Sequence, residues 1–197
     1  MDHYFTIETS AVAEFKDRGS KFIAFSYPLK NVNDFKKHLQ ALKKEHSKAV
    51  HHCFAYRIGV DGNNFRVSDD GEPSGTAGKQ ILGQIDSKNL TDILIVVVRY
   101  FGGTLLGTSG LIQAYKTAAA DALQQSVKVT KYITQTCKVN FNTEVTNLVM
   151  RYLKEYDAEI VEHTFDTENE IIFNIRQSFA EKLRTSLKEN NINCNPI

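Results

Sequence analysis

One stretch of the chain, between positions 66 and 79, gathers carboxylates, hydroxyls and glycines. Asp69, Asp70 and Glu72 fall within four residues, and Ser74 follows closely. Hard oxygen ligands of this kind bind Mg²⁺ or Ca²⁺. The spacing is not that of an EF-hand loop, however, and it fixes no coordination geometry. The alternative is a solvated loop that caps the next helix with Ser74 or Thr76. Both interpretations stay open, and no metal site is firmly predicted.

A second stretch, at positions 99–110, is rich in glycine and begins with an arginine. It lies between a predicted buried strand and a predicted helix, so the free N–H groups at the start of that helix would form an anion site. Arg99 could add a bidentate phosphate contact. The stretch matches neither a Walker loop nor the GxGxxG pattern. The alternative is a tight connection whose glycines serve packing. The candidate anion-binding or nucleic-acid-binding residues are Lys21, Lys79, Arg99, Tyr100, Gly102, Gly103, Thr104, Gly107, Thr108 and Ser109.

A third stretch, positions 30–52, is basic, with six lysines against Asp34 and Glu45. A positive helix face of this kind can neutralise nucleic-acid phosphates, or it can be simply the solvated side of an amphipathic helix. The stretch ends in His51-His52 and is followed by Cys53, and a strand there would place His51 and Cys53 on one face. Two ligands without a third make a weak metal site. No nucleophile with the spacing of a known catalytic motif is present, so no catalytic residue is assigned.

The elements that must position these residues are those of an α+β protein. In the first part of the chain, strands are predicted at 4–15, 21–29, 54–58 and 65–67, with a helix capped by Asn33. The run 93–98 is aliphatic without alternation, which is typical of a strand buried on both faces. An amphipathic helix follows over 108–126.

The second part of the chain predicts the order β-α-β-β-α with a short final strand at 192–195. Ile171, Phe173 and Ile175 alternate as in a half-buried strand. Ser178 and Glu181 predict a capping box ahead of the last helix. This order is that of the ferredoxin-like βαββαβ sandwich. We therefore expect two domains, 1–128 and 129–197.

Composition narrows the class of protein. The chain has 197 residues, a formal net charge of +1 and 42% hydrophobic residues. These values are ordinary for a globular protein and exclude a strongly basic coat. Three widely spaced cysteines argue against a disulfide scaffold or a zinc ribbon. No apolar run is long enough to span a membrane, and the start of the chain does not look like a secretory signal. We therefore expect a cytoplasmic protein without a membrane partner.

The same stretches resemble the YigZ/IMPACT family. The resemblance covers about residues 15–125 and rests on the run from Gly78 to Gly107, on the motif at positions 68–73, and on Gly19-Ser20-Lys21-Phe22. It implies a ribosomal-protein-like (domain 2-like) β-α fold for the first domain, shared with domain IV of translocation factor EF-G and with GHMP kinases. The second domain resembles the terminal ferredoxin-like domain of the same factor. Eukaryotic relatives regulate translation initiation, whereas the bacterial form implies no settled activity.

Three functional hypotheses follow. The first is a non-enzymatic, translation-associated protein that binds RNA or the ribosome through a cleft between the two glycine-containing stretches, with no DNA specificity. The second is an enzyme that holds a phosphorylated small molecule or nucleotide on the glycine loop and Mg²⁺, its only expected cofactor, on Asp69, Asp70 or Glu72. The third is an adaptor that presents the second domain to a protein partner.

Overall fold

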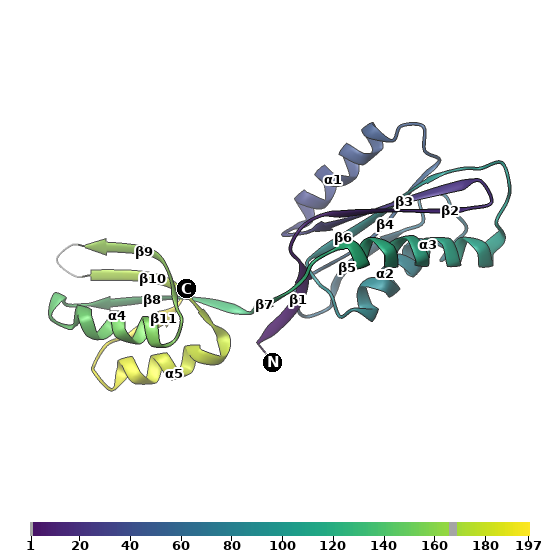
Figure 1. Ribbon diagram of the computed structural model, residues 1–197. Coiled ribbons are helices and arrows are strands. Elements are labelled where there is room, and N and C mark those ends of the chain that lie inside the picture. Colours follow the sequence, from purple (N-terminus) through teal and green to yellow (C-terminus); the bar gives the residue numbers. More distant parts are fainter. Residues whose placement is uncertain (1, 166–168) are drawn as a thin grey trace. The chain divides into compact units, whose positions relative to one another are not determined.

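The computed structural model describes residues 2–165 and 169–197 (Figure 1). The chain forms two compact units. One holds residues 4–130, and the other holds 131–197 together with Asp2 and His3. Strands β1 (His3–Ile7) and β7 (Lys128–Tyr132) pair as a separate two-stranded sheet. The division between the units therefore runs through this strand pair and crosses the chain twice, whereas the sequence had indicated one crossing near residue 129.

The N-terminal unit is built on a five-stranded antiparallel sheet in the order β2-β3-β6-β4-β5. Its strands are β2 (Ala11–Asp17), β3 (Ser20–Pro28), β4 (His51–Ile58), β5 (Asn64–Ser68) and β6 (Ile93–Tyr100). The central strand β6 is buried from Ile93 to Arg99. The prediction of a strand buried on both faces is thus confirmed.

Helices cover both faces of this sheet (Figure 1). Helix α1 (Val32–Glu45) packs Phe35 and Leu42 against one face. Helices α2 (Gly78–Ser87) and α3 (Gly107–Gln125) cover the other, where alanines of α3 allow close approach to the sheet. Because β6 runs between these two apolar layers, its alternate side chains enter different cores. The result is a three-layer arrangement of helix, sheet and helices.

The C-terminal unit is a four-stranded antiparallel sheet in the order β11-β8-β10-β9. Its elements are β8 (Thr134–Phe141), the short 3₁₀ helix η1 (Thr143–Val145), α4 (Thr146–Glu155), β9 (Glu159–Phe165), β10 (Asn169–Arg176), α5 (Gln177–Lys188) and β11 (Cys194–Pro196). Both α-helices lie on one face (Figure 1) and bury Val149, Leu183 and Leu187 against Val139 and Phe173. The predicted α+β class and ferredoxin-like order are confirmed.

Three local predictions were wrong. The strand expected at 4–15 is two strands, β1 and β2, separated by a bend. Helix α1 is capped by Asn31, whose Oδ1 accepts from two backbone N–H groups, and not by Asn33. The capping box at the start of α5 does not form, because Ser178 is already helical and its hydroxyl donates to Asp2.

No helix among the described residues combines the length and apolar character needed to cross a membrane. Cys53, Cys137 and Cys194 are all buried free thiols.

Candidate functional site

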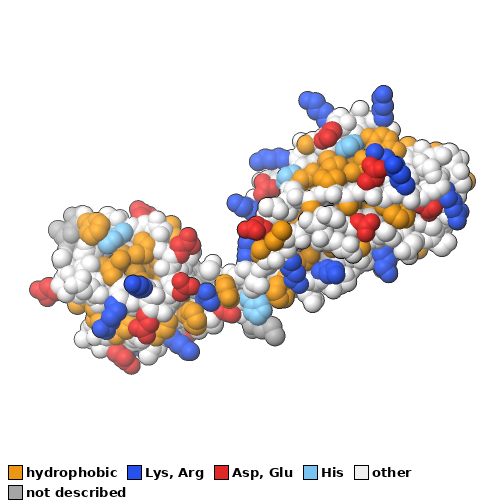
Figure 2. All heavy atoms as spheres, viewed as in Figure 1, with side chains coloured by type: hydrophobic (Ala, Val, Ile, Leu, Met, Phe, Trp, Pro, Cys, Tyr) orange, Lys and Arg blue, Asp and Glu red, His pale blue; other side chains and the backbone are white. Residues whose placement is uncertain are grey.

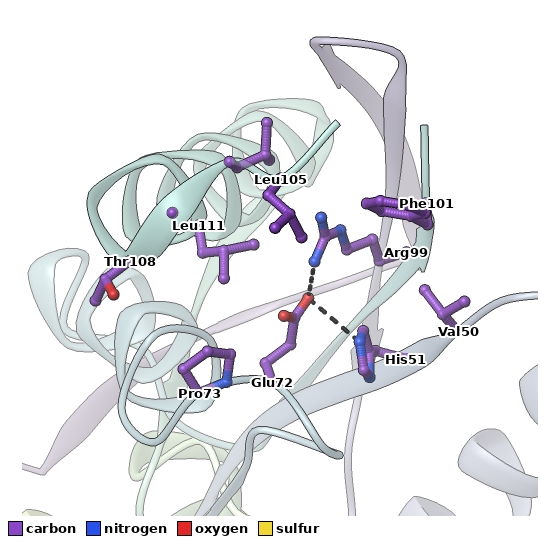
Figure 3. Close-up of a pocket in the computed structure, with 11 residues that line it drawn as sticks. Val50, His51, Glu72, Pro73, Arg99, Phe101, Leu105, Thr108 and Leu111 are labelled. Carbon is purple, nitrogen blue, oxygen red and sulfur yellow. Dashed lines mark hydrogen bonds and ion pairs between the residues drawn. The ribbon is translucent and has the colours of Figure 1, made fainter. Parts of the chain in front are cut away.

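A pocket of about 390 Å³ opens at one end of the N-terminal sheet (Figure 3). Three parts of the chain line it: the start of β4, the loop before α2, and the segment from the end of β6 into α3. We call it the Glu72 pocket. Its lining residues are Val50, His51, Glu72, Pro73, Arg99, Phe101, Leu105, Leu106, Gly107, Thr108 and Leu111. The two glycine-containing stretches singled out in the sequence therefore meet in space.

The floor of the pocket is a buried ion pair. Arg99 Nη1 donates to Glu72 Oε1 at 2.6 Å, and the two side chains are only 6% and 3% exposed. The same oxygen accepts the hydroxyl of Tyr115 at 2.7 Å. The guanidinium also lies over the rings of Phe22 and Phe101. Arg99 is therefore held internally, and the free phosphate-binding guanidinium suggested by the sequence is not what the fold builds.

His51 stands beside this pair. Its Nδ1 lies 2.8 Å from the carbonyl oxygen of Asp70, so this nitrogen carries the hydrogen and donates it. In the neutral ring Nε2 then bears the lone pair, 3.8 Å from Glu72 Oε1. Cross-strand pairing places His51 opposite Arg99, which explains why both side chains reach the same face.

Cys53 and Tyr115 extend the polar network beneath the pocket. The Cys53 thiol lies 3.0 Å from the carbonyl oxygen of Asp69 and 3.3 Å from the Tyr115 hydroxyl. Burial raises the pKa of the Cys53 thiol far above its ordinary value, and burial likewise raises the pKa of Tyr115. Both groups are therefore neutral hydrogen-bonding groups and not nucleophiles.

The acidic stretch is used chiefly to hold the backbone. Asp69 accepts the N–H groups of Gly75, Ala77 and Gly78, so it caps α2 from nine residues upstream of that helix. Asp70 accepts the N–H of His52 at 2.6 Å. Helix α2 therefore starts without help from Ser74 or Thr76, against the alternative raised from the sequence.

The three carboxylates of this stretch therefore have different roles: Asp69 caps α2, Asp70 binds the backbone of β4, and Glu72 pairs with Arg99 in the pocket floor. Within residues 2–165 and 169–197, no three His, Cys, Asp or Glu side chains are grouped to hold a metal ion. Ser74 is exposed in the turn, and the structure gives it no side-chain hydrogen bond among the described residues.

The glycine-rich loop owes two of its glycines to local geometry. A Cβ on Gly102 would lie 1.9 Å from the carbonyl carbon of Gly19, so the loop and the β2–β3 turn touch backbone to backbone. Gly103 has φ +86°, a conformation that side chains with a Cβ rarely adopt. The Ser20 hydroxyl also accepts the N–H of Gly102 at 3.2 Å. Packing explains this part of the loop.

The remaining candidates lie at different distances from the pocket. Gly107 and Thr108 line it at the uncapped start of α3, whereas Thr104 and Ser109 are exposed beside it. Tyr100 points to the opposite face of the sheet, where its hydroxyl contacts His46 Nδ1 at 2.9 Å.

Two further candidates, Lys21 and Lys79, do not line the pocket. Lys21 pairs with Glu14 at 2.7 Å on the edge of the sheet. Lys79 is exposed in the first turn of α2.

A basic surface adjoins the pocket through the C-terminal end of α1. Lys43 Nζ lies 3.5 Å from Asp70 Oδ1, and the N–H of Val50 donates to the Arg99 carbonyl at 2.9 Å. Lys44 lies beside Lys43 in the last turn of α1, and Lys48 lies two residues before the pocket residue Val50. Both lysines are exposed. Lysine and arginine side chains project around α1 in Figure 2. We call Lys43, Lys44 and Lys48 the basic edge.

Sequence reasoning missed several residues of this site. Phe101 and Leu105 form an exposed apolar rim, with 48% and 81% exposure. Tyr115 lies on the buried face of α3, and its hydroxyl donates to Glu72. The sequence signal for the rim was the pair of large apolar residues inside a glycine loop, where polar residues are usual.

Fold and site together define a class: a two-domain α+β protein whose three-layer N-terminal domain carries a partly apolar pocket and whose second domain is ferredoxin-like. The sequence pattern of the family described as "Impact N-terminal domain" matches residues 18–123. An IMPACT family member of Haemophilus influenzae is 32% identical over 191 residues, covering 96% of this chain and 93% of that protein. The chain belongs to the IMPACT family.

Other relatives match chiefly the N-terminal domain. The Escherichia coli family member YigZ is 43% identical over 108 residues, which cover 54% of this chain and 53% of that protein. A crystal structure of a hypothetical protein superimposes with a TM-score of 0.76 at 26% identity, covering 100% of this chain and 98% of the other. The two-domain architecture is thus shared over the whole length.

Proposed function

We propose that this protein is a translation-associated regulatory protein that binds single-stranded RNA, on or off the ribosome, at the end of its N-terminal domain that carries the Glu72 pocket. The observation that carries the proposal is the meeting of three features there: the exposed ring of Phe101, an uncapped helix N-terminus and the basic edge. Unpaired bases stack on exposed aromatic rings, and lysines and helix N-termini contact phosphates. Membership of the IMPACT family supports the connection with translation.

The charges decide which residues would contact phosphate. Arg99 is buried and already neutralised by Glu72, so it contributes little to a phosphate contact. Lys44 and Lys48 are exposed. Each lysine that neutralises a phosphate of a single strand contributes about 0.7 to the slope of log affinity against log salt. The basic edge, and not the arginine favoured by the sequence, is therefore the expected electrostatic contact.

The Mg²⁺-dependent enzyme finds less support. Asp69 accepts three backbone N–H groups, and Asp70 accepts one and faces Lys43. These oxygens would have to leave their partners to bind a cation. A nucleotide phosphate would also approach a floor that already holds the carboxylate of Glu72.

The test is fluorescence anisotropy of a labelled single-stranded RNA 12-mer over a range of salt, with the double variant Lys44→Ala/Lys48→Ala. We expect weaker binding and a salt slope whose magnitude is smaller by about 1.4. The matched control is Lys154→Ala/Lys182→Ala, which removes two exposed lysines of the C-terminal domain and should leave binding unchanged. RNA binding whose affinity changes neither with salt nor in the Lys44→Ala/Lys48→Ala variant would contradict the proposal. Ribosome association that survives nuclease treatment would favour the protein adaptor instead.

A further inference from the structure

The floor of the Glu72 pocket offers an unused hydrogen-bond acceptor. Glu72 Oε1 accepts hydrogen bonds from both Arg99 and Tyr115, whereas Oε2 has no hydrogen-bond partner among the residues that the structure describes. Figure 3 shows this second oxygen turned away from Arg99 and His51, into the space between the labelled side chains. A carboxylate oxygen can only accept, so a ligand that reaches it must bring an N–H or O–H.

His51 adds a second acceptor to the floor, because its Nε2 lies 3.8 Å from Glu72 Oε1, the other oxygen of the same carboxylate. Because Nδ1 donates to the Asp70 carbonyl, the lone pair of the neutral ring is on Nε2, beside the Glu72 carboxylate. Arg99 adds no accessible donor to the floor: Nη1 donates to Glu72 Oε1, Nη2 lies 3.5 Å from Ser20 Oγ, and Nε, which has no partner among the described residues, is buried. The floor therefore presents two acceptors and selects a ligand with two neighbouring donors.

The walls restrict the rest of the ligand. They are largely apolar and include Val50, Pro73, Leu106 and Leu111. Phe101 at the mouth is half exposed, so it can cover a flat ring. The volume of about 390 Å³ lies in the range of small-ligand pockets and suits a single base-sized group.

We propose that the Glu72 pocket takes the guanine base of one unpaired nucleotide, with N1–H and the 2-amino group donating to Glu72 Oε2 and His51 Nε2. Guanine is the common base whose Watson–Crick edge carries two adjacent donors. Adenine and cytosine carry a ring nitrogen that accepts hydrogen bonds beside their amino group. The lone pair of this nitrogen would face the carboxylate, which can donate no hydrogen bond to it. Uracil has one donor flanked by carbonyl oxygens. This inference rests on the proposed function and names the base that the RNA site selects.

Free nucleosides test the pocket separately from RNA binding. In NMR titrations of the full chain, guanosine should bind at least about tenfold more tightly than adenosine. Inosine, which keeps N1–H and lacks the 2-amino group, should fall between them, because one hydrogen bond is lost. Phe101→Ala should weaken guanosine binding several-fold. The matched control Phe165→Ala removes an exposed ring of the C-terminal domain and should have no effect.

Each outcome separates the two proposals. Equal binding of guanosine and adenosine, or no nucleoside binding while the RNA 12-mer still binds, would overturn the guanine pocket and leave the RNA function standing. Guanosine binding without RNA binding would overturn the RNA function and leave the guanine pocket standing. Glu72→Gln gives a second test, since it should abolish the preference for guanosine; if this variant fails to fold, the inosine series and Phe101→Ala still decide. Butylammonium that binds where guanosine does not would assign the pocket to an amine and overturn the proposal.

Discussion

Breaking the buried pair at the pocket floor should cost far more than breaking an ordinary surface pair. Arg99→Met leaves the Glu72 carboxylate buried at 3% exposure, with the Tyr115 hydroxyl as its hydrogen-bond donor and His51 Nε2 at 3.8 Å. Removing one partner of such a pair typically costs about 3–5 kcal/mol. At about 1.4 kcal/mol per factor of ten, that corresponds to an opening equilibrium shifted by about 100- to 5,000-fold. The Glu72→Gln variant, which strands the arginine, should cost a similar amount.

Hydrogen–deuterium exchange of peptides from β6 measures this locally, because it reports opening of the N-terminal sheet apart from the second domain. The double variant Arg99→Met/Glu72→Gln holds no uncompensated charge, so it should be less destabilised than the sum of the two single variants by about 2 kcal/mol. The control is Asp86→Asn, which breaks the ion pair between Arg57 and Asp86. The Asp86 carboxylate is 46% exposed, so this substitution should change the free energy of unfolding by less than about 1 kcal/mol. An additive double variant, or an Arg99→Met cost below about 1 kcal/mol, would refute this reasoning.

Three other predictions concern glycine packing, alkaline stability and the second core. Gly102→Ala should cost about 3 kcal/mol or more, because its Cβ would overlap the backbone of the β2–β3 turn. Gly83→Ala, in α2 with nothing within 4 Å of the new Cβ, should instead stabilise by about 0.5–1 kcal/mol; thermal melts of both check the contrast, and similar shifts would contradict it. Burial raises the pKa of Cys53 and of Tyr115, so the unfolded state loses these protons first. Stability should therefore fall as pH rises above about 9, by up to about 1.4 kcal/mol per pH unit from Cys53, and Tyr115 should add to the fall above about pH 10. A melting temperature that is flat from pH 7 to 10 would disprove this. Leu183→Ala, at 1% exposure, should cost about 2–5 kcal/mol in urea unfolding, and a loss near zero would mean that the helix buries another face.

Local patterns predicted the elements well because they report burial directly. The unbroken aliphatic run at Ile93–Val98 can be satisfied only between two apolar layers, and β6 lies there. Alternation of Ile171, Phe173 and Ile175 likewise placed one face of β10 in the second core. The failures fall at element ends. At the start of α5 the partner is distant, since the Ser178 hydroxyl contacts Asp2, a residue 176 positions away.

The chemistry of the site could be predicted only in part, since each decisive contact joins residues far apart in the sequence. Both stretches that line the pocket were recognised as candidates by composition. Their roles were not readable, because Arg99 meets a glutamate 27 positions earlier and Tyr115 meets the same glutamate across 43 positions. Asp69 caps α2 through a loop that no capping motif describes. A sequence pattern identifies residue types at a site, whereas the fold decides which charges remain free.

The central claim is that RNA binds at the end of the N-terminal domain that carries the Glu72 pocket. The most direct measurement is photocrosslinking of the full chain to a single-stranded RNA that contains 4-thiouridine, followed by mass spectrometry of the crosslinked peptides. We predict crosslinks within residues 43–51 and 99–109, and their loss in the Phe101→Ala and Lys44→Ala/Lys48→Ala variants. Crosslinks confined to residues 131–197, unchanged in both variants, would contradict the claim.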